Sequence, residues 1–403
     1  MAFLQGSMNE KDLLTRGVSE VIDATHLRER IARGDKLRVK FGIDPTGADL
    51  HLGHTVNLWK LRQFQDAGHT AVLVIGDYTA SIGDPSGKNK TRPQISESEI
   101  RENYKQYEKQ VRHIVDGKRL EVRYQSEWYK KFTLKDVILL MTSASVSSVL
   151  AHETFRDRLA KDEPFSSHEF LYPFLQGYDS VAVEADVELG ATEQKFNLLM
   201  GRTIQRAFGQ DPQDVVMSPY LLGTDGVQKM GKSLSNYIGL RDEANEMFGK
   251  IMSIRDGEIF TYFELATPVT SDEIVAMKSS AGDIPTGSVA RDLKLQLAKT
   301  IVSVFHSESA ALSAQEQFLS VFQKGDASSG AREASVSGAS SSLADLLVVT
   351  HLASSKSEAR RAVEAGSVYI DEEKQNNPAF EVALRDGMVV RVGKRNVVRL
   401  KLS

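Results

Sequence analysis

The stretch "DLHLGHTVNLWKLRQF" covers residues 49–64 and places two of the nine histidines of this 403-residue chain three residues apart. With 9 histidines and 29 glycines in the chain, a His-x-Gly-His motif is expected by chance only about 0.014 times. Val56, Trp59 and Gln63 follow at helical spacing, and Gly68 suits the end of a helix. The two histidines therefore stand at the start of a predicted helix.

The start of this helix has the chemistry of an anion site. Its first backbone N–H groups lack partners within the helix, and the helix dipole adds partial positive charge. Imidazole donors at His51 and His54 can bind phosphate oxygens, and Gly53 lets a flat ring approach the backbone. On these residues alone, phosphate binding and plain local capping of the helix both remain open.

Apolar and β-branched runs around this helix predict buried strands. The predicted strands cover residues 37–43, 70–78, 120–128 and 214–223. Amphipathic segments predict helices at 99–115, 134–150 and 192–208. Because strand–helix–strand order implies parallel pairing, the predicted fold class is α/β, with a Rossmann-like, doubly wound, parallel-sheet domain over residues 8–235.

The remainder of the chain divides by composition. Residues 236–324 carry amphipathic helices with few strand signals, and residues 325–342 are so rich in Gly, Ala and Ser that they predict a flexible linker. Residues 343–403 predict a small α+β domain. In that domain, Ser342 and Ser357 are predicted to cap two helices, Gly366 to end the second, and "SVYID", "MVVRVG" and "VVRLKL" to form strands.

Composition excludes several classes of protein. The chain is 41% hydrophobic and 26% charged, with a net charge of −4, so it does not bind nucleic acid through its overall charge. It has no cysteine, which excludes disulfides, thiolate zinc sites and a cysteine nucleophile. No stretch is predicted to span a membrane, the first residues do not resemble a signal peptide, and a cytoplasmic location fits. "GSM" resembles a cloning scar that precedes Met8, so residues 1–7 are set aside.

A second motif, "KMGKS" at residues 229–233, follows a turn-rich stretch. Two lysines that flank Gly231 suit a mobile cationic loop, although for this motif taken alone a solvated charged turn is the favoured explanation. If this loop and the start of the histidine helix meet, they can hold one triphosphate between them.

Together, "HLGH" and "KMGKS" resemble the two signatures of the class I aminoacyl-tRNA synthetases, His-Ile-Gly-His and Lys-Met-Ser-Lys-Ser, in that order. Within this class, four stretches resemble the bacterial tyrosyl-tRNA synthetases: "FGIDPTGADLHLGH", "IGDYTASIGDPSGKNKTRP", "EFLYPFLQGYDSVAVEADVELGATEQKFNLLMGR" and "DGVQKMGKSLSNYIGL". The C-terminal segment resembles the small RNA-binding module of those enzymes. The resemblance spans nearly the whole chain. It implies a tyrosine–tRNA ligase that activates L-tyrosine with ATP and transfers it to the 3′ end of tRNA(Tyr).

The resemblance also implies roles for particular residues. It assigns catalysis to His51, His54, Lys229 and Lys232. It assigns ATP binding to Asp44, Thr46, Gly53, Lys88, Arg92, Gly190, Glu193 and Lys232. It assigns tyrosine binding to Asp84, Tyr172, Gln176, Asp179 and Gln194, with Asp179 accepting a hydrogen bond from the phenol.

Several of these residues also have a simpler structural explanation. Tyr172, Gln176 and Asp179 lie at i, i+4 and i+7 and could form a polar helix surface. Thr192 could cap a helix that begins beside Glu193. Asp84 could belong to a turn, and the charges of Lys88 and Arg92 could simply be solvated.

The chain departs from the usual pattern at four positions. Gly231 replaces a serine, Glu193 an aspartate, and Gln125 an asparagine. Lys40 stands where many relatives carry a tyrosine that contacts the substrate phenol, so a second phenol partner is in doubt.

The partners implied by the resemblance are L-tyrosine, ATP with Mg²⁺, tRNA(Tyr) and a second copy of the chain, with no DNA and no membrane. Residues 385–403 carry six basic residues and one acidic residue, which supports RNA binding, although a solvated strand edge explains them too. Two different functions stay open beside this one: a tryptophanyl-tRNA synthetase and a non-catalytic RNA-binding relative.

Overall fold

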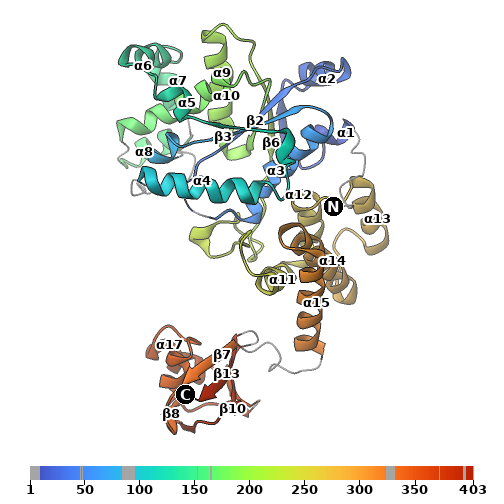
Figure 1. The fold of residues 1–403 in the computed structure, drawn as a ribbon, viewed down its shortest axis with the longest axis vertical. Coiled ribbons are helices and arrows are strands. Elements are labelled where there is room, and N and C mark those ends of the chain that lie inside the picture. Colours follow the sequence, from blue (N-terminus) through green and yellow to red (C-terminus); the bar gives the residue numbers. More distant parts are fainter. Residues whose placement is uncertain are drawn as a thin grey trace. The chain divides into compact units, whose positions relative to one another are not determined.

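The computed structural model describes residues 10–45, 47, 49–83, 96–151, 153–163, 166–323, 332–371, 373–393 and 396–402. The chain forms two compact units, residues 1–311 and 312–403, which Figure 1 draws in sequence colours. The predicted boundaries at residues 235 and 324 make a finer partition and stay predictions.

The first unit is built on a six-stranded sheet in the order β1-β6-β5-β2-β3-β4. All pairs are parallel except β1 with β6. The strands are β1 Glu20–Ile22, β2 Arg38–Ile43, β3 Thr70–Ile75, β4 Leu120–Tyr124, β5 Val187–Ala191 and β6 Asp214–Ser218. The predicted α/β fold is confirmed, and four of these strands were predicted, whereas β1 and β5 were not.

Helices cover both faces of this sheet. In Figure 1, α9 and α10 lie above the sheet, and α3 and α4 lie below it. α3 packs against β2, β3 and β5, while α10 packs against β5, β6 and α9. Their bounds are α3 Leu52–Asp66, α4 Glu97–Val111, α9 Tyr172–Ala182 and α10 Lys195–Ala207.

Several predicted elements have different bounds. The predicted strand at 120–128 ends at Tyr124 because α5 (Ser126–Tyr129) follows at once. The helix predicted at 134–150 is two helices, α6 Leu134–Met141 and α7 Val146–Leu150, because Ser145 caps the second one through the Ser148 N–H. The helix predicted at 192–208 begins as a 3-10 turn, Thr192–Gln194, before α10.

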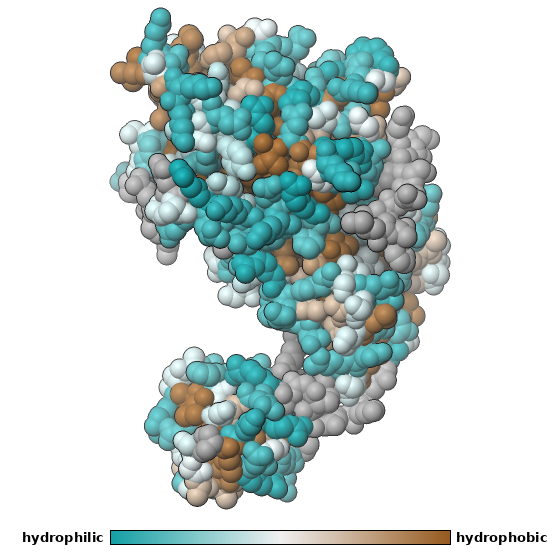
Figure 2. Space-filling model, viewed as in Figure 1, coloured by the Kyte–Doolittle hydropathy of each residue, from teal (hydrophilic) through white to brown (hydrophobic). Residues whose placement is uncertain are grey.

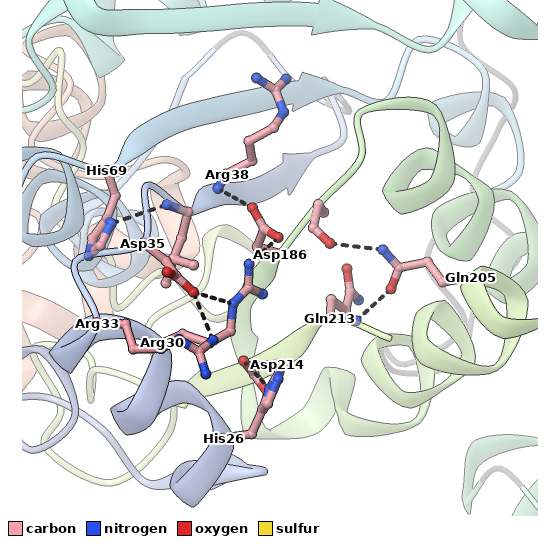
Figure 3. A network of polar contacts seen from close by, with 12 residues as sticks. His26, Arg30, Arg33, Asp35, Arg38, His69, Asp186, Gln205, Gln213 and Asp214 are labelled. Atoms are coloured by element: carbon pink, nitrogen blue, oxygen red, sulfur yellow. Dashed lines mark hydrogen bonds and ion pairs between the residues drawn. The ribbon is translucent and has the colours of Figure 1, made fainter. Parts of the chain in front are cut away.

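A network of polar contacts connects α2 to the amino-terminal edge of the sheet (Figure 3). In it, α2 (Ala24–Ala32) contributes His26 and Arg30, which bond to Asp214 at 3.0 Å and to Asp186 at 2.7 Å. Asp186 also accepts the Arg38 backbone N–H at 2.7 Å. These contacts tie together the starts of β2, β5 and β6. The opposite, carboxyl-terminal edge, where ligands bind in open α/β sheets, carries the motifs that the sequence singled out.

Helices follow the sheet, as predicted. They are α11 Ala244–Met252, α12 Ile259–Ala266, α13 Ser271–Ala281, α14 Gly287–Phe305 and α15 Glu308–Gln323. α12 packs against both α3 and α14. It therefore connects the helices of this region to the core around the sheet. Among the described helices, none has the length and apolar composition needed to cross a membrane.

The second unit contains a five-stranded sheet, β10-β9-β12-β13-β7, and a two-stranded sheet, β11-β8. Its strands are β7 Arg332–Val336, β8 Ser340–Ser342, β9 Val368–Ile370, β10 Glu373–Gln375, β11 Glu381–Ala383, β12 Val389–Val392 and β13 Asn396–Leu402. Its helices are α16 Leu343–Val349 and α17 Lys356–Glu364. The three predicted strands are confirmed as β9, β12 and β13.

Two predictions in this unit are wrong. Residues 332–342 were predicted as linker but form β7 and β8, because backbone pairing with β13 and β11 needs few apolar side chains. Ser355, not Ser357, caps α17, since its hydroxyl accepts the Glu358 N–H at 3.2 Å. Ser342 caps α16 as predicted.

Candidate active site

The histidine pair forms the cap of α3. His51 is the N-cap residue, and its Nδ1 accepts the Gly53 N–H at 3.2 Å. The Nδ1 of His54 accepts the His51 N–H at 3.1 Å, and the two ring centroids lie 3.9 Å apart. Because both Nδ1 atoms accept, each neutral ring carries its proton on Nε2. The predicted capping is therefore present, and an Nε2–H donor on each ring is left over.

Both imidazoles are neutral at pH 7. Burial, and then the nearby His54 and Lys232, lower the pKa of His51 to about 2. Burial lowers the pKa of His54 to about 4, with Lys232 adding to the effect. The rings consequently act as hydrogen-bond donors, and the positive charge beside them belongs to Lys232.

Backbone hydrogen bonds of the β type join the residues that follow the second motif to the start of α3. Leu52 N–H donates to Ile238 O at 3.0 Å, and Leu240 N–H donates to Leu50 O at 2.9 Å. A methyl group built on Gly47 would lie 3.3 Å from Lys232 Nζ. The start of α3 and the lysine loop therefore share one location, although about 180 residues of sequence separate them.

Asn236 holds the lysine loop in shape. Its side chain is 3% exposed; its carbonyl accepts the Gly231 N–H at 2.9 Å, and its amide donates to Lys229 O at 3.1 Å. Gly231 itself has a φ of −164°, an extended conformation open to any residue, so its backbone does not require a glycine. Lys229 forms an exposed ion pair with Glu193 at 2.8 Å.

Helix α9 brings its three predicted residues to this edge of the sheet. Tyr172 O–H donates to Asp44 Oδ2 at 2.9 Å, and Thr79 O–H donates to Asp44 Oδ1 at 2.6 Å. Asp44 directly follows β2, and a methyl group built on Gly76 would lie 2.0 Å from its Oδ1. Asp44, predicted to bind ATP, thus positions Tyr172, predicted to bind tyrosine.

Asp179 lies further along the same helix and is buried, with 3% exposure. It accepts hydrogen bonds from Gln125 Nε2 at 2.7 Å, Trp128 Nε1 at 3.2 Å and Tyr129 Oη at 3.2 Å. Burial raises its pKa to about 7, against the opposing effect of Lys40. The interpretation of this face as a polar helix surface is wrong, because Tyr172 is also buried.

The third member of the α9 face, Gln176, lies above a buried ion pair. Lys40 Nζ and Glu188 Oε1 are 2.9 Å apart, and their side chains are 0% and 1% exposed. Lys40 therefore bonds to Glu188. Its positive charge also acts on Asp179, where it opposes the rise in pKa that burial causes.

The segment after β5 differs from its simpler interpretation. Thr192 is not a helix cap: Gln194 is the N-cap residue of α10, and its Oε1 accepts the Ala191 N–H at 3.2 Å. A methyl group on Gly190 would lie 2.8 Å from a Leu198 methyl group, so local packing favours a small residue there.

Four predicted site residues, Thr46, Asp84, Lys88 and Arg92, lie outside the described residues. Four residues that contact the site were not predicted: Thr79, Trp128, Tyr129 and Glu188. Of these, Glu188 had a usable signal, because one acidic residue interrupts an otherwise buried apolar stretch.

Comparison with known proteins decides the family. The family described as tRNA synthetases class I (W and Y) matches residues 32–323, and the Tyrosine--tRNA ligase SYY-like C-terminal domain matches residues 325–399. This chain belongs to the class I tyrosine–tRNA ligase family. The tyrosine–tRNA ligase of Moorella thermoacetica is 46% identical over 393 residues, which cover 96% of this chain and 94% of that protein.

Other relatives agree with this membership. The tyrosine–tRNA ligase of Thermotoga maritima is 46% identical over 388 residues and covers 96% of each chain. The solved tyrosyl-tRNA synthetase of Archaeoglobus fulgidus, complexed with L-tyrosine, has a TM-score of 0.60 at 22% identity, covering 75% of this chain and 98% of that chain. That likeness shows the shared fold.

Proposed function

We propose that this chain is a tyrosine–tRNA ligase, as its family membership indicates. The observation that carries the choice of amino acid is the environment of Asp179. An ionised carboxylate accepts about four hydrogen bonds. Among the described residues, Gln125 and Trp128 each donate one to Asp179, while Tyr129 shares its one hydroxyl proton between Asp179 and Leu175 O. A substrate phenol supplies a further donor, and an amino acid without one leaves a buried acceptor unsatisfied, at a cost of about 1–3 kcal/mol.

In the first step, a tyrosine carboxylate oxygen attacks the α-phosphorus of ATP. A P–O bond forms to give tyrosyl-adenylate, the bond to the β-phosphate bridge breaks, and pyrophosphate leaves. No general base is needed because the carboxylate is already ionised. In the second step, a terminal ribose hydroxyl of tRNA attacks the adenylate carbonyl, the ester forms, and AMP leaves.

The residues around α3 stabilise the phosphates in this proposal. His51 and His54 offer Nε2–H donors, while Lys232 and Lys229 supply positive charge to the β- and γ-phosphates; such preorganised donors stabilise the developing charge. Gly53 leaves room for the adenine. Gly190 and Glu193 lie beside the ribose, Asp44 and Thr46 line the nucleotide site, and Lys88 and Arg92 contact pyrophosphate.

The tyrosine ammonium group is bound by Tyr172, Gln176 and Asp84, and Gln194 lies beside it. Mg²⁺ arrives with the ATP phosphates. The described carboxylates nearby already have partners, since Asp44 accepts from Tyr172 and Glu193 pairs with Lys229. This arrangement suits a magnesium ion held mainly by phosphates and water.

The C-terminal unit binds tRNA(Tyr) in this proposal. Arg385 pairs with Asp371, Arg391 lies 3.9 Å over the Tyr369 ring, and Lys401 lies 3.9 Å from Glu333. Intramolecular contacts therefore engage part of the basic tail, yet the Arg385 and Lys401 side chains remain 69% and 65% exposed. Lys394 and Arg395 lie outside the described residues. We also propose that the protein acts in the cytoplasm and that neither DNA nor a membrane is among its partners.

We also propose that the protein is a homodimer through α6 and α7. Large hydrophobic side chains are exposed there, and Figure 2 shows hydrophobic residues at the upper left, where Figure 1 labels α6. They are Leu134 (76% exposed), Ile138 (56%), Leu139 (55%), Met141 (45%) and Val146 (67%). Several large apolar side chains exposed on two neighbouring helices favour an interface there. Sedimentation of an Ile138→Lys variant tests it: a monomer supports the proposal, and an unchanged dimer contradicts it.

The decisive test of the function is ATP–pyrophosphate exchange with tyrosine, phenylalanine and tryptophan in turn. We expect exchange with tyrosine only. Exchange with tryptophan would assign the chain to the other branch of its family, and RNA binding without any exchange would make it a non-catalytic relative. Lys232→Ala is the matched negative control.

A further inference from the structure

Among the described residues, a contact with Glu188 orients the side-chain amide of Gln176. Its Nε2 donates to Glu188 Oε1 at 3.2 Å, while its Oε1 is buried and has no hydrogen-bond partner in the described part of the chain. A buried amide carbonyl without a donor is unfavourable. The carbonyl is therefore ready to receive a donor that the described residues do not supply.

Glu188 cannot accept the amide in any other orientation. Its Oε1 receives Lys40 Nζ and Gln176 Nε2, and its Oε2 receives Ser180 Oγ at 3.2 Å and Gln213 Nε2. If the Gln176 amide rotated by half a turn, two oxygen acceptors would face each other at the same distance. The carboxylate thus selects the rotamer in which N–H points down to the sheet and the carbonyl points away from Glu188.

Lys40 keeps Glu188 in place. The two residues are direct cross-strand neighbours on β2 and β5, and both lie under α9, where Lys40 also donates to Gln176 O at 2.9 Å and Ser180 Oγ at 2.8 Å. A lone buried carboxylate would bear a large desolvation cost. The ammonium offsets that cost and holds the acceptor in place.

We propose that Glu188, held by Lys40, is a positioning residue that fixes the Gln176 carbonyl as the acceptor for the α-ammonium group of the substrate. This inference rests on the proposed function, in which Gln176 binds that group. The proposal assigns a role to Lys40, the lysine that stands where many relatives carry a tyrosine. Lys40 acts through Glu188 on the amino end of the substrate, while Asp179 binds the phenol end.

Two double variants test the proposal, because both remove the buried charges and differ only at the acceptor. K40M/E188M has no acceptor for Gln176, whereas K40M/E188Q keeps a carbonyl there. Replacing a buried ion pair by apolar residues of similar size is often neutral for stability, and thermal unfolding checks this. Calorimetric titration then compares L-tyrosine with 3-(4-hydroxyphenyl)propionate, which lacks only the ammonium group.

We expect K40M/E188M to bind tyrosine roughly 10- to 100-fold more weakly than the wild type, as for a lost hydrogen bond to a charged group. The same variant should bind the propionate within about threefold of the wild type, and K40M/E188Q should restore most of the tyrosine affinity. In a K40M/Q176A background, methionine in place of glutamine at position 188 should cause no further loss.

Equal tyrosine affinity in the two double variants would overturn the proposal, as would equal losses for both ligands. Should K40M/E188M fail to fold, K40M/E188L gives the same comparison against K40M/E188Q: a loss confined to tyrosine supports the proposal, and a loss shared by both ligands refutes it. The proposed function fails separately, if the wild type shows no tyrosine-dependent pyrophosphate exchange.

Discussion

The buried carboxylate of Asp179 makes tyrosine binding dependent on pH. Burial raises its pKa to about 7, so it is largely protonated at pH 6 and ionised at pH 8. A tyrosine phenol donates to the ionised form, because a protonated carboxyl has given up one acceptor position. The apparent Kd is then the intrinsic Kd multiplied by one plus the ratio of protonated to ionised carboxyl, a factor of roughly 11 at pH 6 and about 1.1 at pH 8.

We therefore expect tyrosine to bind about tenfold more weakly at pH 6 than at pH 8. The other titrating groups of the site do not produce this change. His51 and His54, with pKa values of about 2 and about 4, stay neutral throughout the range. Lys60, whose pKa is lowered to about 7, is bonded to the N-terminal segment and not to α9.

Calorimetric titration at pH 6, 7 and 8 measures this dependence. Asp179→Asn keeps the size of the side chain and removes its titration, so its tyrosine affinity should be weaker and flat across the range. Phenylalanine, which has no phenol, should bind the wild type weakly, and its affinity should not fall from pH 8 to pH 6. A flat tyrosine affinity in the wild type, or an equal slope in Asp179→Asn, would refute the reasoning.

Three further changes have definite outcomes. Lys232→Ala should lower the rate of pyrophosphate exchange by roughly 10²-fold, because it removes charge beside the phosphates; an unchanged rate would exclude that role. Tyr172→Phe removes the hydrogen bond to Asp44 and should raise the KM for tyrosine by roughly 10-fold, with kcat as the internal comparison. The lowered pKa of Lys60 means that the unfolded state binds the extra proton between about pH 7 and pH 10, so wild-type unfolding free energy should rise by roughly 1.4 kcal/mol per pH unit. Urea unfolding of Lys60→Met should show a smaller rise.

The strands next to the histidine helix could be predicted because apolar and β-branched residues make up all of β3 (TAVLVI) and most of β2 (RVKFGI). β2 and β3 are buried along most of their length, and the histidine motif marked where α3 begins. β5 was missed because Glu188 interrupts a five-residue strand, and no pattern in a single strand shows that Lys40 lies opposite. A buried charge in a strand can be explained only when its partner on another strand is known.

The site residues divide in the same way. Motif residues could be proposed from the sequence, whereas Thr79, Trp128 and Tyr129 reach the site only because β3, α5 and α9 converge. Likewise, the Ser-rich residues 332–342 look like a linker because their pairing partners, β11 and β13, come much later in the chain.

The two halves of the proposed site differ in how firmly they are built. On the tyrosine side, Lys40 and Glu188 are fully buried and bonded on all sides, and removing one partner of such a pair typically costs about 3–5 kcal/mol. On the nucleotide side, Lys229 and Glu193 form an ion pair whose side chains are 39% and 41% exposed, and exposed pairs contribute only about 0–1 kcal/mol. Lys229 can therefore leave Glu193 for a phosphate at little cost, while the amino-acid pocket keeps its shape. In this proposal, the buried pair keeps the amino-acid pocket rigid, and the exposed pair lets the triphosphate site adapt to its ligand.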